Sequence, residues 1–280
     1  MAKMSAKIGA DRDRERFQDG ARDYAAYLET PQGRLRTDLA FANLQEFLPA
    51  PAAPRLLRAL DIGSGAGTNA VRLAQLGVQV TLLDCSPAML ELAGQAAREA
   101  GIAANIVLRH GDAAQIADLF RGESFDLILC HNVLEFLNDP NAVLRGAAQA
   151  MRDPTAMLSV LVRNRAGEVL KSAIQTGDLE AAEHGLTAEW GTEALFGSPV
   201  RLFARDCLLA ALQGVPHIVI AERGVRVVSD YLPATVLRDG EYARILALER
   251  KLGSRPEFAA VARYTQYLIR RIDSATEHCA

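Results

Sequence analysis

Glycines and an acid form the first segment of the chain that can do chemistry. The segment Asp61–Gly67 reads DIGSGAG and lies between an apolar run and a helical pattern. Glycine permits positive φ angles and lets a ligand approach the backbone closely. A dinucleotide-binding loop would place its third glycine where this chain has Thr68. The motif predicts a small-molecule site, and Asp61 favours a ligand with an amino group over one with a pyrophosphate.

Two further acids follow the next two apolar runs. Asp84 ends the second run, and a carboxylate there can accept hydrogen bonds from both hydroxyls of a ribose. Its alternative role is to cap the helix that follows. Asp112 comes after the third run and can accept a hydrogen bond from an adenine amino group, with the N–H of Ala113 beside it. With Asp61, these residues predict a site for S-adenosylmethionine, which joins an amino-acid end to an adenosine.

Regular alternation of strands and helices is needed to bring these residues together. The apolar runs that predict strands are 56–62, 78–83, 106–108, 125–130 and 157–162, and the patterns that predict helices between them are 69–76, 87–101 and 141–151. Such alternation indicates βαβ units and a parallel sheet. In a sheet of this kind the ligand site lies at the carboxyl ends of the strands. The acids stand at three such ends.

The chain divides into four predicted segments. They are an N-terminal helical segment and linker (1–54), a Rossmann-like cofactor-binding core (55–163), a lid or substrate insertion (164–204) and a C-terminal segment that completes the sheet with a helical excursion (205–280). Within the last segment, 217–228 predicts a strand and 241–252 a helix. Residues 265–271 fit either a final strand or the end of a helix.

Composition limits the classes of protein that the chain can belong to. Of its 280 residues 50% are hydrophobic, which is enough for a sizeable core. A net charge of −3 and a pI of about 6.0 argue against binding nucleic acid, DNA included, through a general positive field. The four cysteines lack zinc-binding spacing, and no apolar run is long enough to span a bilayer. We expect a cytoplasmic protein with free thiols, no metal and no membrane contact; its oligomeric state stays open.

The order of these motifs resembles the class I S-adenosylmethionine-dependent methyltransferases. A closer resemblance, which extends from Phe17 to Arg271, is to the bacterial tRNA carboxymethoxyuridine methyltransferases. It depends on Phe17, Ala21 and Tyr24 with Gly33–Arg36, on His131–Glu135, on Gly224–Leu232, and on Leu248, Glu249, Pro256 and Ala262–Tyr264. The block Gly224–Leu232, GVRVVSDYL, is the most specific of these.

The resemblance implies a fold, an activity and a set of cofactor contacts. The fold is a Rossmann-like, mostly parallel seven-stranded sheet with helices on both faces and a helical insertion after the fifth strand. The activity is esterification of a carboxylate on a wobble uridine of tRNA. The residues expected at the cofactor are Arg36, Asp61, Gly63, Ser64, Gly65, Gly67, Asp84, Cys85, Met89, Asp112, Ala113 and His131. Arg36 can form a charge-assisted pair with the methionyl carboxylate.

We expect the acceptor to bind between the insertion and a few basic residues. Arg163 and Arg201 are candidate partners of an acceptor carboxylate because the guanidinium fork binds in a bidentate manner, and His131 is a candidate base for a hydroxyl or an amine. The other residues expected at this end are Arg36, Asn164 and Arg226. The aromatic residues of the insertion either stack on a planar acceptor or form the core of the lid; they are Trp190, Phe196 and Phe203.

Two classes of methyl acceptor fit the sequence. Residues 187–197 hold two acids and no lysine, whereas contacts to phosphate need basic side chains. This favours a small carboxylic acid, phenol or amine, while the resemblance along the chain favours tRNA. A noncatalytic cofactor-binding protein is disfavoured by the intact set of acids. A nicotinamide oxidoreductase is disfavoured by Asp61 and Thr68.

Overall fold

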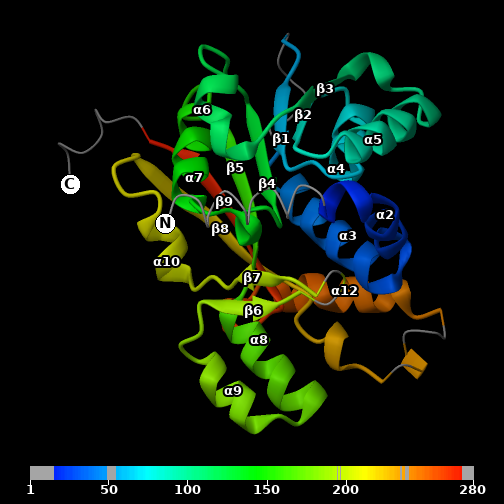
Figure 1. Ribbon diagram of the computed structural model, residues 1–280, viewed down its shortest axis with the longest axis vertical. Coiled ribbons are helices and arrows are strands. Elements are labelled where there is room, and N and C mark those ends of the chain that lie inside the picture. The colour runs from blue at the N-terminus through cyan, green and yellow to red at the C-terminus, as the bar shows by residue number, and fades with distance from the viewer. Residues whose placement is uncertain are drawn as a thin grey trace.

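A computed structural model describes residues 16–48, 55–193, 195, 197–233, 235–236 and 240–272. The charged segment 1–15 and the predicted linker at 50–54 lie outside these residues. A seven-stranded sheet in the order β3-β2-β1-β4-β5-β9-β8 runs through the molecule (Figure 1). Its strands are β1 (Arg58–Ile62), β2 (Gln79–Asp84), β3 (Ile106–His110), β4 (Leu127–His131), β5 (Met157–Arg163), β8 (His217–Val225) and β9 (Tyr264–Arg271).

The directions of the strands confirm the predicted Rossmann-like fold. The strands β1 to β5 pair in parallel, and β9 is antiparallel to both of its neighbours, β5 and β8. Residues 265–271, which fitted either a strand or a helix end, therefore belong to a strand inserted between β5 and β8. Strand β5 is buried along its whole length, as expected of a central strand covered on both faces.

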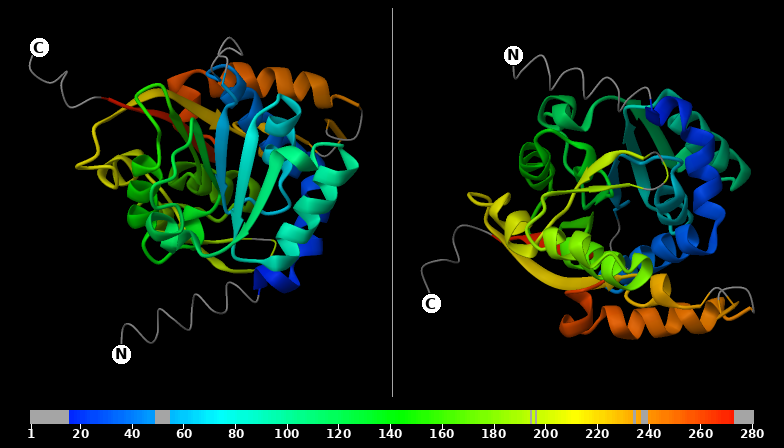
Figure 2. Two further views of the ribbon diagram at one scale, coloured as in Figure 1. Left: turned by 90° about the horizontal axis from the view of Figure 1, so that it is seen from above. Right: turned by 60° about the horizontal axis from the view of Figure 1, so that its bottom comes forward.

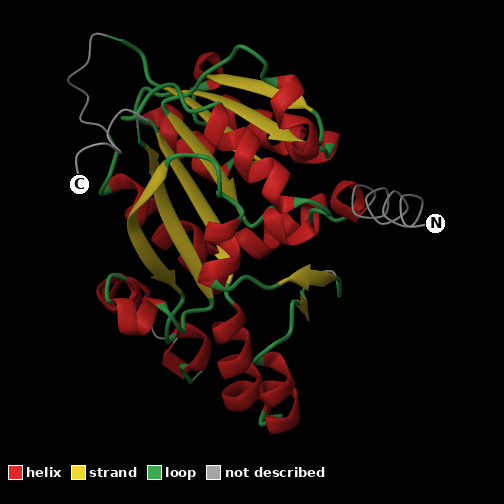
Figure 3. Ribbon diagram, turned by 90° about the vertical axis from the view of Figure 1, so that its left-hand side faces the viewer, coloured by secondary structure: helices red, strands yellow, loops and turns green. Residues whose placement is uncertain are grey.

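Helices cover both faces of the sheet (Figures 2 and 3). One layer holds α6 (Ile116–Leu119), α7 (Pro140–Gln149) and α10 (Arg205–Ala210), and the other holds α3 (Pro31–Gln45), α4 (Thr68–Gln75), α5 (Pro87–Glu99) and α12 (Tyr242–Gly253). In the first layer Leu144 packs in one cluster with Ile128 of the sheet. In the second, Leu73 shares a cluster with Leu82. Burying a leucine in this way contributes about 1.5–3 kcal/mol.

The N-terminal helical segment consists of two helices that meet at Thr30. Helix α2 (Ala21–Glu29) ends at Thr30, whose hydroxyl accepts a hydrogen bond from the N–H of Gly33 at 3.1 Å and so caps α3. Pro31 occupies the first turn of α3, where its missing N–H costs nothing. A Cβ atom at Gly33 would lie 2.1 Å from the carbonyl oxygen of Tyr27. Only glycine therefore lets the two helices approach this closely.

The insertion after β5 differs from the predicted helical one in its second half. It begins with α8 (Arg165–Lys171), a π-helical turn (Ser172–Thr176) and α9 (Leu179–Gly185), beyond one end of the sheet in Figures 1 and 3. A small antiparallel hairpin follows, made of β6 (Trp190–Thr192) and β7 (Pro199–Arg201). Strands this short are too brief to show an alternating pattern in the sequence. A short helix α13 (Pro256–Ala259) precedes β9.

No helix in the described ranges combines the length and the apolar character that crossing a bilayer requires.

Candidate active site

A cavity of about 690 Å³ opens at the carboxyl ends of the parallel strands. Residues at the ends of four strands line it: Gly63 after β1, Asp84 on β2, His131 on β4 and Arg163 on β5. Helices α2 and α3, the insertion, the segments after β3 and β4, and residues next to β8 and β9 supply the remaining walls. The volume lies in the range of small-molecule sites. The predicted convergence of chemistry-bearing residues at one edge of the sheet is therefore present in the structure.

The glycine loop and Asp84 form one hydrogen-bonded unit. The Asp84 carboxylate accepts hydrogen bonds from the N–H of Gly65 at 2.8 Å and from the N–H of Ser86 at 2.9 Å. Ser86, not Asp84, is the N-cap of α5, because its hydroxyl accepts a hydrogen bond from the N–H of Met89. Gly63 has a φ of +62°, and a Cβ atom there would lie 2.3 Å from the Val133 side chain. The loop needs glycine at that position.

A second, smaller chamber lies behind the loop and contains Asp61. Burial, and then the charge of Asp84, raise the pKa of Asp61 to about 7. The hydroxyl of Ser64 and the amide oxygen of Asn69 line the same chamber and are buried without a hydrogen-bond partner among the described residues. Arg36 lines both the chamber and the main cavity. The acceptor oxygens of this chamber suit an amino group and the Arg36 guanidinium suits a carboxylate, so together they fit a ligand end that carries both.

The remaining predicted cofactor residues separate into two groups. Cys85, Met89, Asp112 and Ala113 line the main cavity on the side of β2 and β3. Gly67 lines neither the cavity nor the chamber. It begins α4 with a φ of +77°, and a Cβ atom there would lie 2.8 Å from the Ala93 side chain. The glycine at 67 therefore serves the packing of α4 against α5.

His131 is held by hydrogen bonds at both ring nitrogens. Its Nδ1 lies 3.2 Å from the amide nitrogen of Asn69, and its Nε2 lies 2.8 Å from the Ser159 hydroxyl. Burial, and then the charge of Arg36, lower the pKa of His131 to about 3. The imidazole is therefore a weak base, which makes it a poor candidate for the predicted general base.

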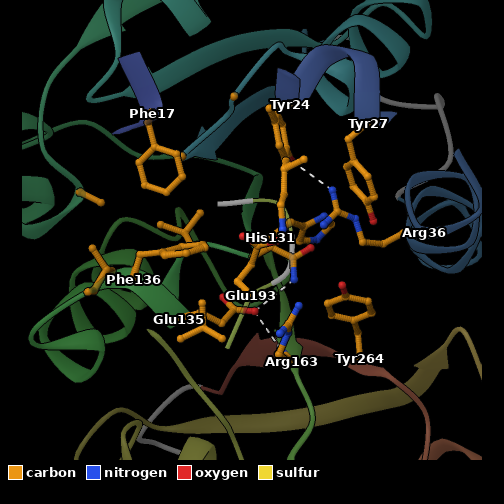
Figure 4. Close-up of a pocket in the computed structure, with 18 of the residues that line it drawn as sticks. Phe17, Tyr24, Tyr27, Arg36, His131, Glu135, Phe136, Arg163, Glu193 and Tyr264 are labelled. Carbon is orange, nitrogen blue, oxygen red and sulfur yellow. Dashed lines mark hydrogen bonds between the residues drawn. The ribbon is translucent and has the colours of Figure 1, made fainter. Parts of the chain in front are cut away.

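Arginines converge on a tyrosine in the other half of the cavity (Figure 4). The guanidinium carbons of Arg36, Arg163 and Arg226 lie 5.9, 6.0 and 5.8 Å from the centre of the Tyr264 ring. Arg263 precedes Tyr264 and pairs with Glu168 of α8. All four guanidinium groups belong to buried residues that line the cavity. This half of the cavity suits a negatively charged group.

Several residues expected at the acceptor do not reach the cavity. Arg201 is not among its lining residues and stacks on Trp190, with 4.6 Å from its guanidinium carbon to the ring centre. The side-chain amide of Asn164 instead donates to the carbonyl oxygens of Ala260 and Ala262. Phe203 packs into the core of the first helical layer. Phe196 lies outside the described residues.

Several other residues that line the cavity were not predicted from the sequence. Phe17, Tyr24 and Tyr27 come from the N-terminal helical segment, and the three-residue spacing of the tyrosines was the available signal for a shared helix face. Glu135 is buried, and its Oε1 accepts hydrogen bonds from the N–H of Arg163 at 2.8 Å and from Asn132 at 3.1 Å. Its Oε2 is buried without a partner among the described residues. It stands in Figure 4 beside Arg163.

Three of the four cysteines lie in the described part of the chain. Cys85, Cys130 and Cys207 are free thiols there, and Cys279 lies outside it. Among the described residues, no three or more His, Cys, Asp or Glu side chains gather in a way that could hold a metal ion.

Comparisons with known proteins agree with this geometry. Residues 60–156 match a family model described as a methyltransferase domain. The chain is 30% identical to the tRNA 5-carboxymethoxyuridine methyltransferase of Escherichia coli K12, over 88% of this chain and 91% of that protein. It is 36% identical to the ubiquinone biosynthesis O-methyltransferase of Azorhizobium caulinodans, over 39% of this chain and 41% of that protein. The solved structure of the magnesium protoporphyrin IX methyltransferase of Synechocystis PCC 6803 with bound SAH superposes with a TM-score of 0.58 at 15% identity, covering 94% of this chain and 100% of that one.

Proposed function

The chain belongs to the class I S-adenosylmethionine-dependent methyltransferases, in the family that includes tRNA 5-carboxymethoxyuridine methyltransferase, and on that premise we propose that it esterifies a carboxylate on a wobble uridine of tRNA. The observation that carries this proposal is the arginine-lined half of the cavity, which lies at the ends of β5, β8 and β9 in the same cavity as the glycine loop. Arg163, Arg226 and Arg263 are buried there around Tyr264. A buried guanidinium is a natural partner of a carboxylate.

We assign the cofactor to the half of the cavity at β1, β2 and β3. When bound, S-adenosylmethionine supplies an electrophilic methyl group on its sulfonium. Asp84 accepts from the ribose hydroxyls, Asp112 and Ala113 face the adenine, and Asp61 and Arg36 receive the amino-acid end. The oxygens of Ser64 and Asn69, which have no hydrogen-bond partner among the described residues, add polar contacts at that end.

The weak basicity of His131 favours a carboxylate acceptor over a hydroxyl or an amine. A carboxylate is ionised at neutral pH and needs no base before it attacks, whereas a hydroxyl or a protonated amine must lose a proton. His131 has both ring nitrogens in hydrogen bonds and a lowered pKa, so it is poorly suited to take that proton. The protein therefore acts mainly by orienting the acceptor and excluding water.

Label transfer to tRNA tests the proposal. The full-length enzyme is incubated with methyl-labelled S-adenosylmethionine and tRNA that carries unesterified 5-carboxymethoxyuridine. We expect label on that nucleoside, and mild alkali should remove it, because alkali hydrolyses an ester but leaves N- and C-methyl groups in place. The Asp84→Ala variant, in which cofactor binding should be weakened, serves as the control and should transfer less label at a limiting cofactor concentration. Label that resists alkali would contradict esterification.

A small carboxylic acid is the second candidate acceptor. The net charge of −3 and the acids of the insertion, Glu189 and Glu193, favour it. Salt dependence distinguishes the two acceptors, since binding through several phosphates weakens steeply as salt rises and binding of a monoacid weakens little. Transfer to a free carboxylic acid with no transfer to tRNA would select the second candidate.

A further inference from the structure

Tyr264 occupies the centre of the arginine cluster because of its place in the sheet. It is the first residue of β9, where it pairs with Arg163 of β5 on one side and with Val225 of β8 on the other. Arg226 directly follows Val225. The insertion of β9 between β5 and β8 thus brings arginines from both neighbouring strands to one tyrosine.

The Tyr264 side chain has an apolar base and a charged rim. Its ring packs in one buried cluster with Leu35, Leu39, Leu161 and Val225. Its hydroxyl points in Figure 4 into the space between Arg36 and Arg163. The residue is only 4% exposed, yet it lines the cavity.

Charged groups reach this rim from each surrounding element. They are Arg36 of α3, Arg163 of β5, Arg226 and Asp230 after β8, Arg263 before β9 and Glu168 of α8, with Tyr24 and Tyr27 of α2 and with Glu135 and Glu193 on the walls of the cavity. Asp230 pairs with Arg226 and Arg263, and Glu168 pairs with Arg163 and Arg263. Arg36 donates to the Tyr24 hydroxyl at 3.1 Å. Among the described residues, Arg36 forms no ion pair with a carboxylate.

We propose that Tyr264 is an acceptor-binding residue: its hydroxyl donates a hydrogen bond to the acceptor carboxylate, and its phenolate stands between the arginines when no acceptor is bound. This inference rests on the proposed carboxylate acceptor. The chemistry is a single proton transfer. As the carboxylate enters, the Tyr264 oxygen takes one proton from solvent, so one anion in the cluster is neutralised while another arrives, and no other bond forms or breaks.

The electrostatics of the site agree with this exchange. Burial alone would raise the pKa of Tyr264, but the charges of Arg226, Arg36, Arg163 and Arg263 outweigh it and lower the pKa to about 7. Below that pH the phenol is already protonated and acceptor binding needs no proton. Above it, binding consumes a proton, so acceptor affinity falls by up to about tenfold for each further pH unit.

The first test needs no acceptor. Tyrosinate absorbance of the full-length protein is followed as the pH rises through neutrality. We expect the wild type to show one tyrosine that ionises near neutral pH, and Tyr264→Phe to lack that step. Tyr267→Phe is the matched control, because Tyr267 lies on the same strand but packs against the opposite face of the sheet. A wild type without the neutral step would overturn the proposal.

The second test adds the nucleoside 5-carboxymethoxyuridine, with uridine as the ligand that lacks the carboxylate. At about pH 8 the acid should abolish the tyrosinate signal and bind with uptake of about one proton, and uridine should do neither. Tyr264→Phe should bind the acid with no proton uptake. Below about pH 7, where the wild-type hydroxyl donates, the variant should bind the acid more weakly than the wild type. Acid binding that leaves the tyrosinate signal unchanged would overturn the inference. Loss of the signal in an enzyme that does not methylate tRNA would contradict the proposed tRNA substrate and leave the role of Tyr264 standing.

Discussion

The carboxylate of Asp84 holds the backbone N–H of Gly65 at 2.8 Å, which ties the end of β2 to the glycine loop after β1. Two motifs that are separate in the sequence therefore form one hydrogen-bonded unit in the half of the cavity proposed for the cofactor. The same carboxylate also receives the N–H of Ser86. Its side chain is thus fixed before any ligand binds.

Asp84→Ala should weaken S-adenosylmethionine binding by roughly 1–3 kcal/mol, the loss expected when a charged hydrogen-bond acceptor is removed. Calorimetric titration measures the change. Asp153→Ala is the matched control, because Asp153 accepts the backbone N–H two residues ahead in the same way but lies outside the cavity. Equal affinities in the wild type and Asp84→Ala would exclude the ribose role.

Arg36→Lys should weaken the cofactor by roughly 1.5–3 kcal/mol although the charge is kept, since lysine lacks the bidentate fork. Arg34→Lys, on the exposed side of the same helix, should have no effect. Substitution is a better test than removing residues 1–36. That truncation would cut into α3 and remove Leu35 from the core, so the sheet would lose packing as well. Unchanged affinity in Arg36→Lys would remove the arginine from the cofactor site.

Asp61→Asn should stabilise the ligand-free protein at neutral pH while weakening the cofactor. The folded-state pKa of Asp61 is raised to about 7, so the stability that its protonated form contributes is complete below about pH 4 and is lost as the pH rises through 7. Asparagine cannot ionise and should show no such loss. Thermal unfolding of both proteins between about pH 4 and pH 8 checks this. Parallel stability profiles would show that Asp61 is not strained by burial.

Glu249→Gln should lower acceptor turnover without changing cofactor affinity. Glu249 is fully buried and accepts hydrogen bonds from three consecutive backbone N–H groups, those of Val227, Val228 and Ser229. This holds the segment directly after Arg226, whose φ of +62° is strained for a residue with a side chain. An amide cannot accept at both of its ends, so the loop should loosen at a cost of roughly 1–3 kcal/mol in unfolding free energy.

Methyl transfer kinetics and calorimetry separate the two effects in Glu249→Gln. The exposed Glu257→Gln is the control, and it should behave as the wild type. A loss of cofactor affinity as large as the loss of turnover would mean that Glu249 supports the whole fold and not the acceptor half of the cavity.

The sequence by itself determined the parallel part of the sheet and the edge at which the proposed cofactor residues gather. Alternating apolar runs and helical patterns indicate parallel strands, and parallel strands place their carboxyl ends at one edge. Asp84 and Asp112, which follow such runs, had to meet the glycine loop there. These features depend on local patterns and on one rule of topology, which is why they could be predicted.

The tertiary structure alone decided the acceptor half and the state of its groups. Tyr264 meets Arg163 only because β9 enters the sheet beside β5, and the sequence left residues 265–271 open between a strand and a helix end. The sequence offers no reason to distinguish Arg201 from Arg163, but Arg201 stacks on Trp190 and does not line the cavity. His131 is neutral because burial, and then the charge of Arg36, lower its pKa. A side chain's partners and its protonation depend on burial and on charges that come from distant parts of the chain, and no local pattern records them.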